Sequence, residues 1–270
     1  ATQLSQGDYT PRARVTGRDE ISELAASFNH MADAIEKNVQ ELEDAARRQE
    51  DFTASFVHEL KTPLTSIIGY ADMLRSRDLG EDKQFKAASY IFSEGKRLEN
   101  LSLALMSLLV VGHATADVRS VNMQRLCLEA ERISLPAIRG KGLSLVVQAE
   151  EGSLQGDPAL LQMLLQNLLD NARKASEPGG LLVLEGRRTG SGYCLTVSDQ
   201  GRGIPEAELS KITEAFYMVD KSRSRAEGGA GLGLALCKEI AALHQGSLHF
   251  ESQLDLGTKV TVELGGIALA

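Results

Sequence analysis

The residues around His58 suit chemistry at an imidazole ring. The apolar positions of this stretch follow a helical stripe made of Phe52, Phe56, Leu60, Leu64 and Ile67. At about 100° per residue, His58 lies roughly 200° from Phe56 and therefore faces away from that stripe. A core histidine would lie on the stripe, so two roles remain: an ordinary solvated histidine, or a neutral imidazole that acts as a nucleophile.

The residues that follow His58 favour the nucleophile. Glu59 can accept or stabilise the proton on the ring as the imidazole attacks. Thr62 lies four residues on, on the same helical face as His58, where its hydroxyl can hold a water molecule near the ring. Pro63 removes a backbone donor in mid-helix, which predicts a kink just beyond the reactive residue.

A second group of polar residues lies on a leucine-rich helical stretch. The spacing of Asn167, Asn171 and Lys174 puts the three side chains on one helical face. A neutral amide oxygen suits Mg²⁺, which takes few protein ligands and keeps waters and phosphate oxygens, and a lysine one turn away would meet the phosphates. Amides on a helix surface are common, so the pattern alone also fits a plain solvated face.

Two glycine-rich segments carry further polar groups. Asp199–Pro205 follows a strand predicted over Tyr193–Val197, where a carboxylate can accept from an adenine amine and two glycines let backbone approach the base. An ordinary glycine turn is the alternative. Gly228–Leu234 opens a helix predicted to run to about Leu243, and its backbone N–H groups suit phosphate oxygens. Its spacing is neither GxGxxG nor GxxxxGK[ST], so no Rossmann or P-loop site is indicated.

Three compositional regions carry these residues. Residues 1–19 are short and irregular. Ser22 to Leu109 is almost wholly helical in character, interrupted by Pro63 and by the polar turn at 77–82, which predicts a helical hairpin. From about Val118 onward, short apolar runs alternate with helical ones, which predicts an α+β domain. Besides Tyr193–Val197, the predicted strands are Leu143–Val147, Leu181–Leu184 and Lys259–Leu264.

The first helix of the hairpin has a repeat typical of helices that pair. Steps of three and four from Phe28 to Phe56 give nine positions, of which seven are apolar, with charged residues alongside. A 3.5-residue repeat favours a coiled coil in which Asn38 can fix the register, and a single amphipathic helix packed on its own domain is the alternative. Two helices alone bury little surface, so we expect a second copy to complete a four-helix bundle, which makes the protein a homodimer.

The segment Phe56–Leu64 resembles the phospho-acceptor box of the sensor histidine kinases of two-component systems. Gly7–Tyr9, Asp19–Leu24 and Phe28–Met31 resemble the end of a HAMP signal-relay domain, which normally follows a transmembrane helix. The resemblance extends over nearly the whole chain. It implies an α+β multidomain fold, in which a helical hairpin that forms a dimeric four-helix bundle is followed by an α/β sandwich of the GHKL ATPase type.

The resemblance also implies three domains. Residues 1–50 would be the C-terminal part of a HAMP domain and a coiled-coil signalling helix. Residues 51–117 would form the dimerisation and histidine phosphotransfer hairpin, and residues 118–270 the catalytic ATP-binding domain.

Roles in a nucleotide site follow from the same resemblance. The stretch from Asn167 to Lys174 matches the asparagine box, in which the second asparagine, here Asn171, holds Mg²⁺. Asp199 corresponds to the family's adenine-binding aspartate. The implied site also includes residues of two glycine boxes, a phenylalanine box and a polar lid, namely Gly201, Gly203, Phe216, Tyr217, Lys221, Arg223, Gly229, Gly231, Leu232 and Gly233. A solvated loop would have the same composition as that lid.

One position departs from the family pattern. Met218 stands where the family usually has an arginine, which is expected to help with phosphate charge. Its loss would weaken phosphotransfer or shift the task to Lys221 or Arg223. It motivates the alternative of a catalytically degenerate dimeric scaffold with a nucleotide-binding domain. Other ATPases of the superfamily, such as a heat-shock chaperone or DNA gyrase B, lack a histidine hairpin ahead of the ATP domain.

The implied function is that of an ATP-dependent protein-histidine kinase with His58, Glu59 and Thr62 as its catalytic residues. ATP binds with Mg²⁺, His58 attacks the γ-phosphate, and the phosphoryl group passes to an aspartate of a separate response regulator. Thr62 motivates a second activity, as a phosphatase of that regulator. Transfer within one subunit and transfer across the dimer both remain open.

Composition limits the other classes of function. With 29 Lys and Arg against 37 Asp and Glu, the net charge is -8, and nucleic-acid binding is not expected. Three cysteines without CxxC spacing indicate neither a disulfide scaffold nor a zinc ribbon. The longest apolar stretch, Leu103–Val111, is far shorter than the ~20 residues that span a bilayer. The HAMP-like start therefore predicts the cytoplasmic portion of a bacterial membrane protein, anchored only through a segment absent from this chain.

Overall fold

The computed structural model describes residues 9–17, 19–76, 79–113, 117–190, 192–220 and 231–267. The chain divides into two compact units, Ala1–His58 and Glu59–Ala270. The division falls within helix α1, which extends from Glu20 to Ser76.

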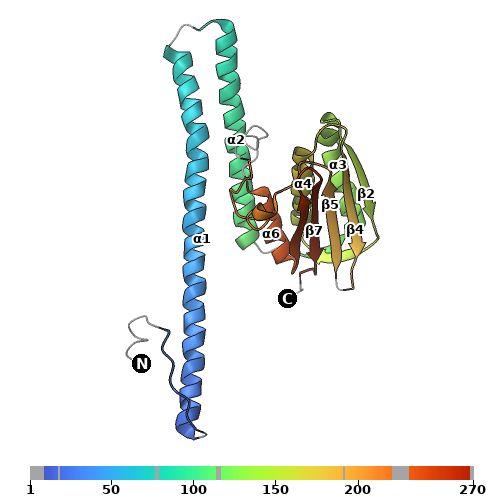
Figure 1. Ribbon diagram of the computed structural model, residues 1–270. Coiled ribbons are helices and arrows are strands. Elements are labelled where there is room, and N and C mark those ends of the chain that lie inside the picture. The colour runs from blue at the N-terminus through green and yellow to red at the C-terminus, as the bar shows by residue number, and fades with distance from the viewer. Residues whose placement is uncertain are drawn as a thin grey trace. The chain divides into compact units, whose positions relative to one another are not determined.

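In the first unit, an extended segment of residues 9–16 lies beside the start of α1 (Figure 1). Ala13 exchanges two hydrogen bonds with the side chain of Asn29: its N–H donates to Oδ1 at 2.7 Å, and its carbonyl accepts from Nδ2 at 2.9 Å. Arg12 pairs with Asp33 at 2.7 Å and with Glu36 at 2.5 Å. These polar contacts fix the segment to the helix without a large apolar core.

The apolar side chains of the repeat on α1 are exposed or half-buried in a single chain. Met31 and Leu42, two positions of the repeat, are 57% and 69% exposed. Large exposed apolar side chains at a 3.5-residue spacing are what a paired helix requires. Pairing with a second helix stays a prediction.

In the second unit, the C-terminal part of α1 and helix α2, Glu81–His113, form an antiparallel hairpin (Figure 1). Tyr70 and Tyr90 stack across it with ring centroids 4.8 Å apart. The prediction that Pro63 interrupts the helix is wrong, because α1 is continuous through that residue. The proline removes one intrahelical bond, which its N–H would have donated to the carbonyl of Glu59. The kink expected beyond Pro63 stays a prediction.

The rest of the second unit is built on a five-stranded mixed sheet of order β2-β4-β5-β7-β6. β2 is parallel to β4, and all other neighbours are antiparallel. The four strands predicted from apolar runs are confirmed with shifted ends, and β6 is an additional edge strand. Their bounds are β2 Ser144–Ala149, β4 Leu181–Arg188, β5 Tyr193–Asp199, β6 Ser247–Gln253 and β7 Gly257–Leu264.

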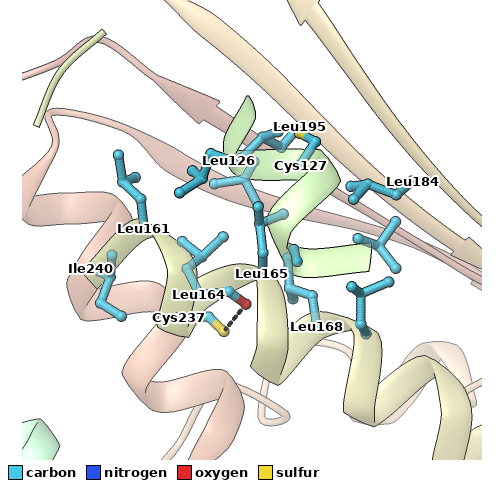
Figure 2. Close-up of a cluster of buried hydrophobic side chains, with 14 of the residues drawn as sticks. Leu126, Cys127, Leu161, Leu164, Leu165, Leu168, Leu184, Leu195, Cys237 and Ile240 are labelled. Carbon is cyan, nitrogen blue, oxygen red and sulfur yellow. Dashed lines mark hydrogen bonds between the residues drawn. The ribbon is translucent and has the colours of Figure 1, made fainter. Parts of the chain in front are cut away.

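Three helices cover one face of this sheet: α3 (Met123–Gly140), α4 (Pro158–Ala175) and α6 (Gly233–Leu243) (Figure 1). Apolar side chains from all three meet those of β4 and β5 in the core (Figure 2). Within it, the Cys237 thiol lies 3.7 Å from the Leu164 carbonyl and donates a weak bond that joins α6 to α4 (Figure 2). The core therefore fixes the two helices that carry the candidate site.

Smaller elements complete the unit. Strands β1 (Arg119–Asn122) and β3 (Ser153–Gly156) form an antiparallel pair, and a 3-10 helix, η2, covers Glu206–Glu208. The three cysteines are free. In the part of the chain that the structure describes, no helix is both long enough and apolar enough to cross a bilayer.

Candidate nucleotide site and phospho-acceptor histidine

A cavity of about 720 Å³ lies between α4, the segment after β5 and the start of α6. This volume is in the range of small-molecule sites. Its lining includes nine of the residues predicted for a nucleotide site, namely Asn167, Asn171, Lys174, Asp199, Gly203, Tyr217, Gly231, Leu232 and Gly233. The fold thus brings together predicted residues from four separate stretches of sequence.

The last turn of α4, which carries Lys174, is held by side chains from outside the helix. The ammonium of Lys141, at the end of α3, donates to the carbonyls of Arg173 and Lys174, at 3.0 Å each. The Ser176 hydroxyl donates to the carbonyl of Ala172 at 2.8 Å. A cation at a helix C-terminus also interacts favourably with the helix dipole. Lys141 therefore stabilises the turn whose side chains enter the cavity.

Asp170 also lines the cavity, although it was not predicted as a site residue. In the sequence it lies between Asn167 and Asn171. Its carboxylate pairs with Lys174 at 2.8 Å and with Arg173 at 2.6 Å. Burial would raise the pKa of Asp170, but the bonds and charges of Lys174 and Arg173 outweigh burial and hold the pKa below its ordinary value. Phosphate oxygens would have to compete with this carboxylate for Lys174.

Asp199 ends β5 and presents a carboxylate to the cavity. Burial raises the pKa of Asp199, against the opposing effect of hydrogen bonds from the backbone N–H groups of Gly201 and Thr258. The bond from Gly201 to Oδ1 is 2.8 Å long. An ionised carboxylate only accepts hydrogen bonds, which suits an exocyclic amine such as that of adenine.

The glycines after Asp199 are required by the surrounding protein backbone. A Cβ on Gly201 would lie 2.5 Å from the carbonyl oxygen of Ala175. A Cβ on Gly203, whose φ is +65°, would lie 2.0 Å from the carbonyl oxygen of Gln253. The sequence suggested that these glycines let the backbone approach a base. In the structure, it is the neighbouring protein backbone that lies close to Gly201 and Gly203.

Phe216 and Gly231 form the ends of the segment that contains the predicted lid. The N–H of Phe216 donates to the carbonyl of Gly231 at 2.8 Å, and both residues have positive φ, 66° and 68°. A Cβ on Gly231 would lie 2.7 Å from the carbonyl carbon of Phe216, so only glycine fits. The predicted residues Lys221, Arg223 and Gly229 lie between these ends and outside the described residues.

The N-terminus of α6 faces the asparagines of α4. A Cβ on Gly233, the first residue of α6, would lie 2.9 Å from Oδ1 of Asn167. Leu232 at the N-cap supplies no side-chain acceptor, so the first-turn N–H groups suit phosphate oxygens. Oxygen donors are the ligands of Mg²⁺, and the amide of Asn171 together with nucleotide phosphates fits that ion.

Helix α1 carries the three residues predicted for phosphotransfer. His58 is exposed, Glu59 is buried and Thr62 is half-buried. Oε2 of Glu59 accepts a bond of 2.6 Å from Nη2 of Arg97 in α2. Arg97 was not predicted as a site residue, and the sequence signal that points to it is its i, i+3 spacing from Glu94.

His244, to which the sequence analysis assigned no role, is fully buried at the end of α6. Its Nδ1 donates to the carbonyl of Ile240 at 2.7 Å, and its Nε2 accepts from the N–H of Asp157 at 3.1 Å. Burial lowers the pKa of His244, which keeps the ring neutral as this pattern requires. Asp157 is the N-cap of α4, so His244 connects the end of α6 to the start of α4.

Three family models match the chain. The first 37 residues match the HAMP domain, and residues 48–108 match the His Kinase A (phospho-acceptor) domain. Residues 156–265 match the histidine kinase-, DNA gyrase B-, and HSP90-like ATPase.

Curated relatives are similar along nearly the whole chain. The signal transduction histidine-protein kinase BaeS of Escherichia coli (strain K12) is 29% identical over 266 residues, which cover 97% of this chain and 55% of BaeS. The sensor histidine kinase YclK of Bacillus subtilis (strain 168) is 30% identical over 269 residues, 97% of this chain and 56% of YclK. The chain spans about half the length of these relatives.

Solved structures share the fold. The histidine kinase ThkA in complex with the response regulator protein TrrA has a TM-score of 0.65 at 21% identity, over 83% of this chain and 65% of that chain. Full-length ShkA in complex with AMPPNP has a TM-score of 0.58 at 24% identity, over 82% of this chain and 47% of that chain. The common fold is a helical hairpin followed by a mixed α/β domain.

Proposed function

The chain belongs to the sensor histidine kinases of two-component systems, and from that membership we propose that it is an ATP-dependent protein-histidine kinase. Its matches to a phospho-acceptor domain and to an ATPase domain support this activity. The observation that carries the proposal is the convergence of Asn171, Lys174 and Asp199 on one cavity with the open N-terminus of α6, in a chain that exposes His58.

Binding in the proposed reaction follows from the donors and acceptors of the cavity. Asp199 accepts from the adenine amine, while Lys174 and the first-turn N–H groups of α6 bind phosphate oxygens. Asn171 contributes an oxygen ligand to Mg²⁺, which neutralises phosphate charge when it is bound.

In the transfer step, a ring nitrogen of His58 forms a bond to the γ-phosphorus as the bond to the β–γ bridging oxygen breaks, and ADP leaves. Glu59 stabilises the proton on the other ring nitrogen. The phosphoryl group then moves from the ring to an aspartate carboxylate of a separate response regulator, which restores the free histidine. Positioning and charge neutralisation account for most of the rate, as in other phosphoryl transfers.

The proposed domain division assigns residues 1–50 to the end of a HAMP domain and a signalling helix, 51–117 to the phosphotransfer hairpin and 118–270 to the ATP-binding domain. The family-model matches at 1–37, 48–108 and 156–265 support it. The HAMP match also supports a cytoplasmic place in a membrane-anchored sensor. Exposed apolar side chains on the hairpin support a homodimeric four-helix bundle, among them Leu64, Ile68 and Phe92.

The proposal is tested by incubation of the chain with Mg²⁺ and ATP labelled at the γ-phosphate. We expect label on the protein that is stable in base and lost in acid, as a phosphorus–nitrogen bond requires. Acid-stable label would indicate a hydroxyl acceptor and contradict the proposal. Nucleotide binding without any label would favour the degenerate scaffold, for which Met218 on the cavity wall is the motivating observation.

A second candidate activity is dephosphorylation of the partner regulator, motivated by Thr62 one helical turn beyond His58. Thr62→Ala is expected to slow loss of phosphate from the regulator while autophosphorylation proceeds at the wild-type rate. Equal loss of both activities would count against it.

A further inference from the structure

The hydroxyl of Ser252 joins three segments near the part of the cavity that Asp199 lines. Ser252 lies in β6, and its Oγ accepts from the N–H of Ile204 at 2.8 Å. The same Oγ donates to the carbonyl of Gly257 at 3.0 Å and lies 2.9 Å from Oγ1 of Thr258. Ile204 and Thr258 both line the cavity. Ser252 therefore acts on the site through residues that do line it.

Only one arrangement of the hydroxyl hydrogens makes every contact of Ser252 a hydrogen bond. A serine hydroxyl has a single hydrogen, and Ser252 donates it to Gly257. In the 2.9 Å pair, the donor is consequently Thr258. The Thr258 hydroxyl then has no hydrogen left for a ligand, so its oxygen can only accept.

Thr258 and Asp199 are neighbours across β5 and β7. The Asp199 carboxylate already accepts from the N–H groups of Gly201 and Thr258, and in its ionised form it donates nothing. The cavity wall thus presents two acceptors at adjacent positions. Such a pair suits a 6-amino group, which offers two hydrogens, and opposes a 6-oxo group, whose lone pairs would meet those of the wall.

We propose that Ser252 is a positioning residue for base selection: it accepts the hydrogen of the Thr258 hydroxyl, keeps that oxygen an acceptor, and so sharpens the preference for a 6-amino purine nucleotide over a 6-oxo purine nucleotide. This inference rests on the proposed function, in which the cavity binds ATP.

The test compares ATP with inosine triphosphate, which differs at the 6-position of the purine. Dissociation constants of both nucleotides are measured by calorimetry on the full chain and on Ser252→Ala. In the variant, the Thr258 hydroxyl can rotate and donate to a 6-oxo group. We expect the dissociation constant of inosine triphosphate divided by that of ATP to fall about tenfold in Ser252→Ala, which is the value of one hydrogen bond. Ser252→Thr retains the hydroxyl and is expected to keep the wild-type ratio.

A double-mutant cycle with Thr258→Val separates this role from a purely structural one. Once the Thr258 hydroxyl is gone, Ser252→Ala should leave the ratio unchanged within about twofold. Ser252→Cys fills the space of the serine side chain but replaces the hydroxyl with a thiol, which is a weak acceptor. If the alanine variant does not fold, the two dissociation constants are compared in this variant instead.

Two outcomes would overturn the inference. If Ser252→Ala weakens the binding of ATP and of inosine triphosphate by the same factor, Ser252 supports the backbone around Ile204 and Gly257 without selecting the base. In that case the proposed function stands. If the wild-type chain binds neither nucleotide, the proposed function fails, and the inference fails with it.

Discussion

Arg97 of α2 and Glu59 of α1 form an ion pair of 2.6 Å, and their side chains are only 10% and 6% exposed. Arg97 also lies 3.5 Å from Glu94 on its own helix. Because Glu59 directly follows His58, the pair connects the residue beside the proposed phospho-acceptor to the second helix of the hairpin. Charges buried to this extent are stable only while they are paired.

Arg97→Met is expected to destabilise the hairpin by about 3–5 kcal/mol, because it takes the Arg97 guanidinium away from the buried Glu59 carboxylate. Glu59→Gln combined with Arg97→Met removes both charges and should recover most of the thermal midpoint. Labelling of His58 should stay low in the double variant, since an amide cannot take up the proton. Thermal melting and label incorporation measure the two effects.

Arg75→Met is the matched control for that pair, because Arg75 is an exposed arginine that pairs with Asp72 near the end of α1. It should change the midpoint little. If the double variant of Glu59 and Arg97 is labelled at the wild-type rate, the Glu59 carboxylate is not needed to stabilise the proton on the His58 ring.

Asp170→Asn is expected to tighten ATP binding up to about fivefold, the order of one exposed ion pair. The substitution frees Lys174 and Arg173 from the carboxylate that now holds them and removes a negative charge beside the phosphates. Adenosine, which has no phosphates, should bind equally well to both proteins. A parallel gain for adenosine would show that the phosphates are not the cause.

Met218→Arg is expected to raise the rate of label incorporation about tenfold, because a guanidinium on the cavity wall can form a charge-assisted bond to a phosphate oxygen. Met218→Gln, which has a similar length but no charge, is the control. If Met218→Arg does not change the rate of label incorporation, other cations already neutralise the phosphate charge.

The free energy of unfolding is expected to fall as the pH falls below about 6.5, where an unfolded histidine binds a proton. Burial lowers the pKa of His244 in the folded chain, so below that pH the unfolded state binds more protons until the lowered pKa is reached. Asp157 beside the ring opposes the shift without reversing it. The stabilisation that neutral His244 provides is therefore complete above pH 6.5 and lost below it.

Substitution by glutamine, which does not titrate, isolates this effect. The gap in thermal midpoint between wild type and His244→Gln should be smaller at about pH 5.5 than at about pH 7.5. His249→Gln, at an exposed histidine on β6, is the control. A gap that widens in acid would contradict the assignment of a neutral buried ring.

Local spacing in the sequence is enough to predict several of the residues that line the cavity. Asn167, Asn171 and Lys174 share a face because the helical repeat places them there, and Asp199 follows an apolar strand. The four predicted strands are confirmed for the same reason. Pro63 is a local signal that the fold overrides, since α1 continues through it despite a penalty of about 3 kcal/mol for proline in a helix interior.

Polar groups that meet across the fold are not predictable in this way. Arg97 is 38 residues from Glu59, and His244 is 87 residues from Asp157. Each pair depends on how distant helices pack, which no local spacing in the sequence encodes. Ser252 acts through Thr258 in the same manner, because the pairing of β6 with β7 brings the two hydroxyls together.

In the proposed reaction, His58 accepts the γ-phosphate of ATP. Its most direct test is label incorporation from γ-labelled ATP into His58→Gln, with His30→Gln as the control at another exposed histidine of α1. We predict that His58→Gln binds ATP with wild-type affinity and takes up no label, while His30→Gln is labelled normally. Continued labelling of His58→Gln would show that another residue accepts the phosphoryl group.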